Sequence, residues 1–268
     1  LTLVYVCIFL YMLYMTNNLD FYTTDPFSDD KLKEECGVFG IHNNADASAH
    51  TALVLHALQH RGQEAAGIVS FNDGEFYCHR AYGHVGDNFN SKDVIDTLPG
   101  DCAIGHVRYS TSGDKKNVNN VQPLFAEFSF GMLGIAHNGN LTNAAVLRKE
   151  LIKNGAIFQS TMDSEVLIHL IATSNKQKVV DRVVDALERI EGAYSMVAIT
   201  RKKLIGARDP LGVRPLVLGK LGDSYIFASE SCALDIIGAS YVRDVEPGEL
   251  IIIDENGLHS TRPLAKQK

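Results

Sequence analysis

Short apolar runs separated by turn residues dominate the first half of the chain and predict β-strands. The runs 65–71 and 75–81 are joined by Asn72-Asp73-Gly74, and Asp-Gly between two such runs is typical of a tight hairpin. Three further runs have the same strand character. We therefore expect strands in this half at residues 37–41, 65–71, 75–81, 102–107 and 132–136.

Longer segments predict helices at 47–59, 142–153, 164–173 and 179–190. The last third returns to short strands, at 193–200, 203–207, 216–218, 224–228 and 250–253. Turn residues such as Asp209-Pro210 separate these strands and favour antiparallel hairpins over parallel crossovers. Strands, then helices, then strands again indicate an α+β fold, with antiparallel sheets layered against helices.

The first fifteen residues are almost wholly apolar and contain no Lys or Arg, unlike a secretory signal, and they are too short to span a bilayer comfortably. Because Met15 directly precedes polar residues, we interpret Met15 as the start of translation and 1–14 as an artefact of the gene model. A membrane-associated leader is the alternative. Residues 16–35 are polar and turn-rich and predict a flexible leader, so we expect a leader or propeptide over 1–35 and one domain over 36–268.

Composition places the chain among ordinary globular proteins, with 268 residues, 46% of them hydrophobic and 21% charged. The net charge of −7 argues against a general nucleic-acid binder and favours a small-molecule substrate. The five cysteines are odd in number and widely spaced, without a Cys-x-x-Cys pair. This cysteine pattern suits a reducing cytoplasm and argues against a zinc site.

Cys36 ends an acidic stretch and begins an apolar run with strand character. If the chain were cut before Cys36, one residue would carry both a thiol and a free α-amine. An α-amine has a pKa of roughly 7.7–8.0, so it can take the thiol proton and later hand it to a leaving amine. The alternative is that Cys36 is a small buried hydrophobe, the commoner fate of a free cysteine.

Three polar segments further along the chain follow predicted strands or precede a predicted helix. Arg108 stands where a strand ends in a hydroxyl-rich loop, and its guanidinium suits a carboxylate, although a structural salt bridge is the plainer interpretation. Asn138 and Gly139 form either a tight turn or the amide and N–H pair of an oxyanion hole. Asp163 is either a helix N-cap or a counter-charge for a substrate ammonium.

Together these residues would supply a nucleophile with its own base, a guanidinium for an anion, two oxyanion donors and a carboxylate. This set suits a substrate with an α-amino acid head and a side-chain carbonyl. Glutamine has that shape. Five segments then carry a family resemblance, in this order: CGVFG at 36–40, LQHRGQEAAGI at 58–68, GHVRYST at 105–111, HNGN at 137–140 and DSE at 163–165. The chain from Cys36 to its end resembles the glutaminase domain of the amidophosphoribosyltransferase family, which are class II glutamine amidotransferases of the N-terminal-nucleophile (Ntn) hydrolase superfamily.

The resemblance implies a role for each matching residue. Cys36 corresponds to the nucleophile, freed by removal of a propeptide that ends at Glu35, with its α-amine as general base. Asn138 and the Gly139 N–H correspond to the oxyanion hole. In the substrate-binding part, Arg108 corresponds to the ligand of the glutamine carboxylate and Asp163 to that of its ammonium, while Arg61 and Thr111 match supporting positions. The implied fold is a four-layer αββα sandwich.

The segments RGQEAAG at 61–67, RDPLGVRPL at 208–216 and SESCALD at 229–235 resemble the phosphoribosyl-transferring branch. That branch implies ammonia transfer to phosphoribosyl diphosphate in a cytoplasmic enzyme, homo-oligomeric in its full form, without nucleic-acid or membrane partners. The chain shows no phosphoribosyl-diphosphate loop, so the transferase domain, and any Mg²⁺ it binds, would lie outside it. We interpret the chain as a fragment, a split gene product or a truncated reading frame.

No cofactor is expected in the chain itself. Some family members carry an iron–sulfur cluster, but no ligand for one can be assigned here, and we interpret Cys232 as a packed thiol. Two other functions stay open: a non-catalytic glutamine-binding or regulatory module, and a class II amidotransferase with another acceptor.

Overall fold

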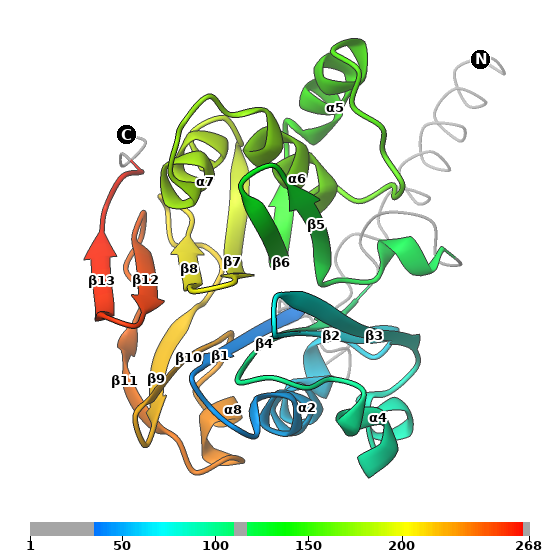
Figure 1. Cartoon of the computed structure of the whole chain (residues 1–268), viewed down its shortest axis with the longest axis vertical. Coiled ribbons are helices and arrows are strands. Elements are labelled where there is room, and N and C mark those ends of the chain that lie inside the picture. Colours follow the sequence, from blue (N-terminus) through cyan, green and yellow to red (C-terminus); the bar gives the residue numbers. More distant parts are fainter. Residues whose placement is uncertain (1–34, 110–116, 265–268) are drawn as a thin grey trace, which may run out of the picture. The chain divides into compact units, whose positions relative to one another are not determined.

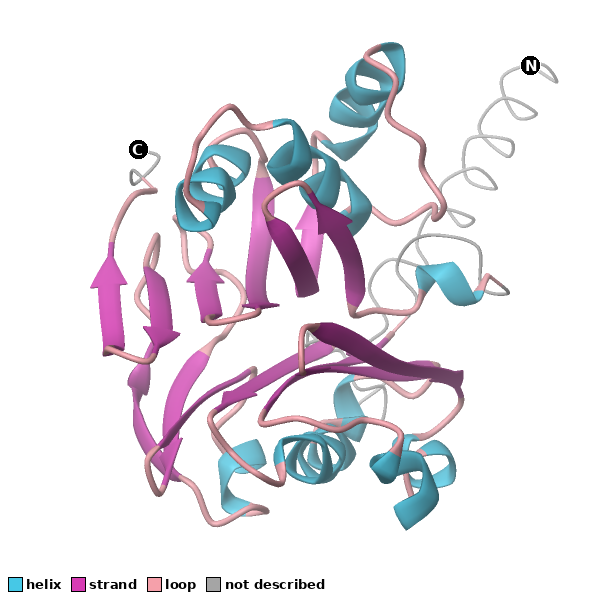
Figure 2. Cartoon of the chain, in the orientation of Figure 1, coloured by secondary structure: helices cyan, strands magenta, loops and turns pink. Residues whose placement is uncertain are grey.

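The protein is described here by a computed structural model covering residues 35–109 and 117–264, all within one compact unit, Glu35–Lys268. Within these residues the chain forms two antiparallel sheets that face each other, with helices on their outer sides (Figure 1, Figure 2). This arrangement confirms the predicted α+β fold with four αββα layers. Of the predicted leader, 1–35, residues 1–34 lie outside the described part, as does Thr111.

The first sheet contains the strand that follows Cys36 at its centre, in the order β11-β9-β10-β1-β4-β2-β3. Its strands are β1 (Gly37–His42), β2 (Ala65–Asn72), β3 (Glu75–Tyr82), β4 (Cys102–Arg108), β9 (Val217–Leu221), β10 (Ser224–Ala228) and β11 (Ser240–Asp244). The outer face of this sheet packs on a helical layer with a shared apolar core. That layer consists of α2 (Ala47–Ala57), α3 (Val85–Asn88), α4 (Lys92–Asp96) and α8 (Cys232–Asp235).

The second sheet has the order β13-β12-β8-β7-β6-β5. Its strands are β5 (Leu124–Phe128), β6 (Gly131–Leu141), β7 (Gly192–Thr200), β8 (Leu204–Arg208), β12 (Leu250–Asp254) and β13 (Gly257–Thr261). Its outer face packs on α5 (Ala144–Lys153), α6 (Ser164–Thr173) and α7 (Val179–Leu187). Two short 3₁₀ turns, η1 (Gln59–Arg61) and η2 (Val118–Asn120), complete the described elements.

A third apolar core fills the space between the two sheets, and strand alternation decides which side chains enter it. On β1, Val38 faces this space while Phe39 faces the helices. On β6, Ala136 faces this space while Ile135 faces the helices. The alternation therefore fixes which polar residues near the strand ends can meet between the sheets.

The predicted strands and helices all occur, with ends shifted by a few residues. The hairpin at Asp73-Gly74 is confirmed, and both residues have positive φ, of 49° and 94°. The sequence reasoning missed β5, β11 and β13, as well as the short helices α3, α4 and α8, because each is too brief or too polar to give a periodic pattern.

One sequence interpretation is wrong. Asn138-Gly139 is not a tight turn, because β6 runs on from Gly131 to Leu141 and pairs both residues with β7. Gly139 has φ of 143°, and a Cβ there would lie 2.0 Å from the carbonyl oxygen of Ala193. The glycine is thus required by close approach of the neighbouring strand rather than by a turn.

Among the described helices, none is both long enough and apolar enough to cross a membrane.

Candidate active site

Cys36 lies immediately before β1, and each of its polar atoms is held by the chain. Its backbone N–H donates to the carbonyl oxygen of Arg61 at 2.9 Å, and its own carbonyl accepts from Arg61 Nε at 2.6 Å. Its sulfur lies 3.3 Å from the N and 3.4 Å from the O of Tyr109. These contacts hold Cys36 at φ of 61°, a conformation that non-glycine residues adopt rarely. The thiol is therefore fixed at the end of a buried strand.

Burial raises the pKa of the Cys36 thiol above its ordinary value, and the nearby charge of Glu35 acts in the same direction. The contact with the Tyr109 backbone and the charges of Arg108 and Arg61 oppose this shift without cancelling it. A thiol with a raised pKa is mostly protonated near neutral pH, so it needs a base to become a nucleophile.

Arg61 is almost wholly buried, at 1% exposure, and serves the backbone of Cys36. Its Nη1 donates to Glu230 Oε1, so a carboxylate neutralises the buried guanidinium. Arg61 therefore contacts the backbone of the candidate nucleophile, whereas the family resemblance implied only a supporting position in substrate binding.

Arg108 ends β4, one position beyond the Gly37–Val107 pair that links β1 to β4, and its charge acts on the Cys36 thiol. It is 1% exposed. Cys102 and Ile104 of the same strand face the space between the sheets, so alternation directs the Arg108 side chain to that space as well. The structure thus places a buried guanidinium beside Cys36.

Asn138 projects from β6 into the same space, because it stands two residues after Ala136, which faces that space. It is 1% exposed, and neither its Nδ2 nor its Oδ1 has a hydrogen-bond partner among the described residues. A buried amide without partners is costly, by about 1–3 kcal/mol, and such groups mark functional positions. Asn138 can donate to an anion that enters between the sheets.

Gln122 links the two sheets next to these residues. Its side chain accepts from the N–H of His137 at 2.8 Å and donates to the carbonyl of His137 at 3.0 Å, and its Nε2 lies 3.4 Å from His106 Nε2. His106 belongs to β4, two residues before Arg108, and His137 directly precedes Asn138. The Gln122 side chain therefore connects the Arg108 strand with the Asn138 strand.

Asp163 stands at the N-cap position of α6, but its side chain does not cap the helix. Instead its Oδ2 accepts from the backbone N–H of Leu141 at 2.9 Å, at the end of β6. The neighbouring Ser164 hydroxyl lies 3.0 Å from His137 Nδ1. Asp163 is thereby tied to the strand that carries Asn138 and Gly139. The N-cap interpretation is confirmed for the position of Asp163 and is wrong for its side chain.

Cys232 is exposed, so its interpretation as a packed thiol is also wrong. It begins the short helix α8, and its sulfur donates to Glu230 Oε2 at 3.2 Å. Among the described residues, no group of three or more His, Cys, Asp or Glu side chains is arranged to hold a metal ion.

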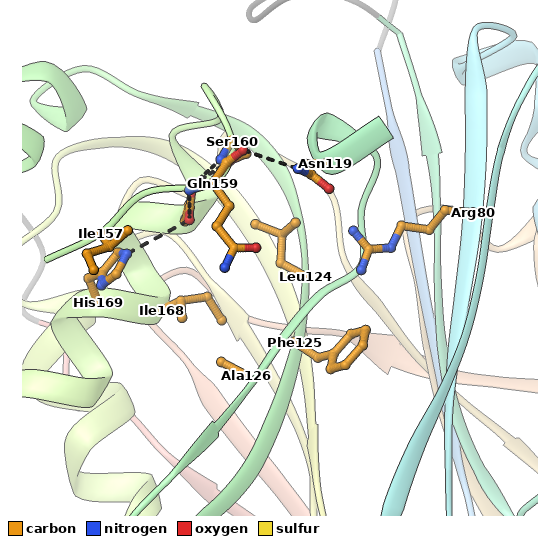
Figure 3. Close-up of a pocket in the computed structure, with 11 residues that line it drawn as sticks. Arg80, Asn119, Leu124, Phe125, Ala126, Ile157, Gln159, Ser160, Ile168 and His169 are labelled. Carbon is orange, nitrogen blue, oxygen red and sulfur yellow. Dashed lines mark hydrogen bonds and ion pairs between the residues drawn. The ribbon is translucent and has the colours of Figure 1, made fainter. Parts of the chain in front are cut away.

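A separate pocket of about 200 Å³ lies beside β5 and α6, and none of the described candidate residues lines it. Figure 3 shows Arg80, Phe125 and Gln159 around it. Its carboxylate, Glu165, already accepts from the backbone of Gln159 and Ser160, each at 2.8 Å. The carboxylate of this pocket is thus used by the chain itself, and we assign the pocket no reaction.

Comparison with known proteins agrees with this geometry. A family model described as "Glutamine amidotransferase domain" matches residues 106–235. The amidophosphoribosyltransferase of Rhizobium etli is 57% identical over 90% of this chain and 48% of its own length, and that of Bacillus subtilis is 45% identical over 86% and 48%. Residues 106–235 thus match the glutamine amidotransferase domain family, and the two relatives are similar to most of this chain.

Solved structures also match this chain. A glutamine phosphoribosylpyrophosphate amidotransferase from B. subtilis, solved with ADP and GMP, matches with a TM-score of 0.80 and 44% identity, over 85% of this chain and 49% of that one. A glutamine aminotransferase class-II domain protein from Silicibacter pomeroyi, at 16% identity and a TM-score of 0.58, shares the fold. The chain spans about half the length of the curated relatives it matches.

Sequence reasoning missed three residues of this candidate site: Tyr109, Gln122 and Glu230. Tyr109 acts through its backbone, which leaves no mark in the residue type. Gln122 and Glu230 are distant in sequence from the residues they contact, at separations of 15 from His137 and 169 from Arg61. The only available signal was that Glu230 lies within the SESCALD segment.

Proposed function

We propose that the chain, once cut before Cys36, hydrolyses glutamine to glutamate and ammonia. The observation that carries this proposal is the backbone nitrogen and sulfur of Cys36, both fixed at the end of β1 beside the buried Arg108. The relatives named amidophosphoribosyltransferase and the glutamine amidotransferase domain model support it.

In the proposed reaction the α-amine of Cys36 takes the thiol proton, and the sulfur forms a bond to the carboxamide carbon of glutamine. The carbonyl oxygen becomes an oxyanion that accepts from Asn138 Nδ2 and the Gly139 N–H. The C–N bond then breaks, the amine returns the proton to the leaving nitrogen, and ammonia departs. Water hydrolyses the glutamyl thioester, which yields glutamate and restores the thiol.

Binding of glutamine is assigned to two charged residues. Arg108 forms two parallel hydrogen bonds to the α-carboxylate, a geometry that lysine cannot reproduce. Asp163 receives the α-ammonium, and its carboxylate is held in place by the Leu141 N–H. Thr111 and Arg61 support this set, with Arg61 acting on the Cys36 backbone.

Cleavage of the Glu35–Cys36 bond has two consequences in this scheme. It converts an amide nitrogen, which has no basicity near neutral pH, into an amine that serves as the base. It also removes the Glu35 charge, which acts to raise the pKa of the thiol. We propose that the thiol attacks the Glu35 carbonyl, forms a thioester by an acyl shift, and is freed by hydrolysis of that thioester.

In the complete protein we propose that the ammonia passes to phosphoribosyl diphosphate, in the first step of purine biosynthesis in the cytoplasm. The support is that the relatives of known name are amidophosphoribosyltransferases about twice the length of this chain. The transferase part, its Mg²⁺ and the homo-oligomeric state belong to that complete protein. We assign no cofactor to the glutaminase part, and no ligand of an iron–sulfur cluster.

The test compares two forms of the protein, one with the Glu35–Cys36 bond intact and one beginning at Cys36 after removal of an initiator methionine. Glutamate release is measured in each, and mass analysis establishes each N-terminus. We expect activity only from the form that begins at Cys36. Glutaminase activity from protein with an intact bond would refute the amine-as-base mechanism, and inactivity of both would favour a non-catalytic glutamine-binding module.

A further inference from the structure

A chain of contacts runs from the backbone of Cys36 to a carboxylate on the surface of the first sheet. The backbone carbonyl of Arg61 accepts from the Cys36 N–H. The Arg61 side chain donates from Nε to the Cys36 carbonyl and from Nη1 to Glu230 Oε1. A buried guanidinium keeps a fixed orientation only where its charge and its donors are matched. Glu230 supplies that match from a position 169 residues away in sequence.

The segment that carries Glu230 is itself fixed to β1. Ser229 donates its backbone N–H to the carbonyl of Val38 at 3.0 Å, and its hydroxyl accepts from the N–H of Val38 at 2.9 Å. Val38 is only two residues from Cys36. The carboxylate is therefore anchored to the same strand end that it supports through Arg61.

The two oxygens of Glu230 have different surroundings. Oε1 accepts from the buried Arg61, whereas Oε2 lies 3.0 Å from His60 Nε2 and 3.2 Å from the sulfur of Cys232, at the surface. Burial acts to raise the pKa of Glu230, but the hydrogen bonds from Arg61 and Cys232 and the Arg61 charge lower it overall. The carboxylate is thus ionised near neutral pH and available to pair with Arg61.

We propose that Glu230 is a positioning residue for glutamine hydrolysis, acting through Arg61 to hold the backbone nitrogen and carbonyl of Cys36 in place. This inference rests on the proposed function of Cys36. The hydrogen bonds described for the Glu230 carboxylate go to Arg61, His60 and Cys232, and none goes to the Cys36 thiol. Glu230 acts on where the nucleophile and its amine lie, so its loss should affect turnover more than glutamine binding.

The experiment measures kcat and KM for glutamine in the processed protein carrying Glu230→Gln, which keeps the shape of the side chain and removes its charge. We expect kcat to fall between about 10- and 100-fold, the range that small misplacements of catalytic groups produce. KM should stay within about twofold, because Arg108 and Asp163 are unchanged. A thermal melt of the variant establishes that it is folded.

A double-mutant cycle with Arg61→Lys separates positioning from a general structural role. If Glu230 acts through Arg61, adding Glu230→Gln to Arg61→Lys should lower kcat by no more than about twofold further. Two variants serve as matched controls and should keep wild-type kcat. Cys232→Ala removes a contact to the outer oxygen of Glu230, and Glu150→Gln breaks the surface pair between Glu150 and Arg189.

The results discriminate between the two proposals. An active wild-type protein with an equally active Glu230→Gln variant would overturn this inference and leave the proposed function standing. Independent, multiplicative effects of Glu230→Gln and Arg61→Lys would also overturn it, as would an effect on KM alone. A processed wild-type protein without glutaminase activity would refute the proposed function and, with it, the role of Glu230.

Discussion

The candidate site has two sides, one at the start of β1 and the other on the second half of β6. They differ in whether their buried polar atoms have hydrogen-bond partners. At the start of β1, the N, O and sulfur of Cys36 all have partners, in Arg61 and Tyr109. On β6, the amide of Asn138 is equally buried, yet both of its polar atoms lack partners among the described residues. The polar atoms of Cys36 are thus hydrogen-bonded within the chain, and those of the Asn138 amide are not.

This difference indicates how the work is divided. A nucleophile must be in place before the substrate arrives, so its position is fixed by the chain in advance. An oxyanion donor has its proper partner only when charge develops on the substrate oxygen, so its hydrogen-bonding capacity is reserved. Leaving this buried amide without a partner lowers the stability of the fold, as is common at functional sites.

The largest expected effect comes from removing the nucleophile. Cys36→Ala should lower glutamine hydrolysis on the order of 10⁶-fold, to the background of the assay, because no other group can form the thioester. The fold should persist, since one small side chain is lost. Glutamate release is measured beside circular dichroism, with Cys232→Ala as the matched control. Residual hydrolysis within tenfold of wild type would remove Cys36 from the mechanism.

The β6 side of the site is tested by Asn138→Ala. This change should lower kcat by about 10²–10³-fold through loss of one oxyanion donor. The thermal midpoint should hardly fall, because the amide makes no hydrogen bond within the described chain. Asn154→Ala, at an exposed position at the end of α5, is the control for both measurements. Normal turnover in the Asn138 variant would exclude it from the oxyanion hole.

A smaller effect is expected from Arg108→Lys, which replaces a two-pronged guanidinium by a single point charge. KM for glutamine should rise about tenfold with little change in kcat, since the clamp acts on ground state and transition state alike. Steady-state kinetics over a range of glutamine concentrations measure this split. If kcat fell and KM did not, Arg108 would act on the thiol and not on the substrate carboxylate.

The smallest expected effect is on the pH dependence of stability, through His106, whose Nε2 lies 3.4 Å from Nε2 of Gln122. Burial, together with the charges of His137 and Arg108, lowers the pKa of His106 to about 3. The unfolded chain therefore binds a proton near pH 6.5 that the folded chain refuses, so this stability is complete above pH 6.5 and declines below it. The loss should be under about 1 kcal/mol between pH 7 and pH 6, and steeper at lower pH.

Urea denaturation at pH 7, 6 and 5 measures this loss. His106→Gln should flatten the dependence, because glutamine does not titrate. The same pH dependence in wild type and variant would show that His106 does not contribute.

The comparison also shows why some features were predictable from sequence. Cys36 stood out at the start of an apolar run and Arg108 at the end of another, and strand ends are where polar side chains reach a site. The turn at Asp73-Gly74 was predictable because its conformation depends on local residue types. Asn138 and Gly139 were recognised as a pair, as either a tight turn or oxyanion donors. The turn alternative could not be excluded from the sequence, because a sequence does not reveal that β7 lies alongside and extends the strand.

The sequence by itself determined the alternating strands and helices, the α+β class and the candidate residue types, because these depend on local periodicity and on chemistry carried by single residues. Only the tertiary structure decided the contacts among them. Arg61 contacts the Cys36 backbone and Glu230. Asp163 accepts from the Leu141 N–H at the end of β6, and Gln122 connects the two sheets. Such contacts join residues far apart in the chain, and they are set by how the two sheets pack and by the need to pair buried polar groups.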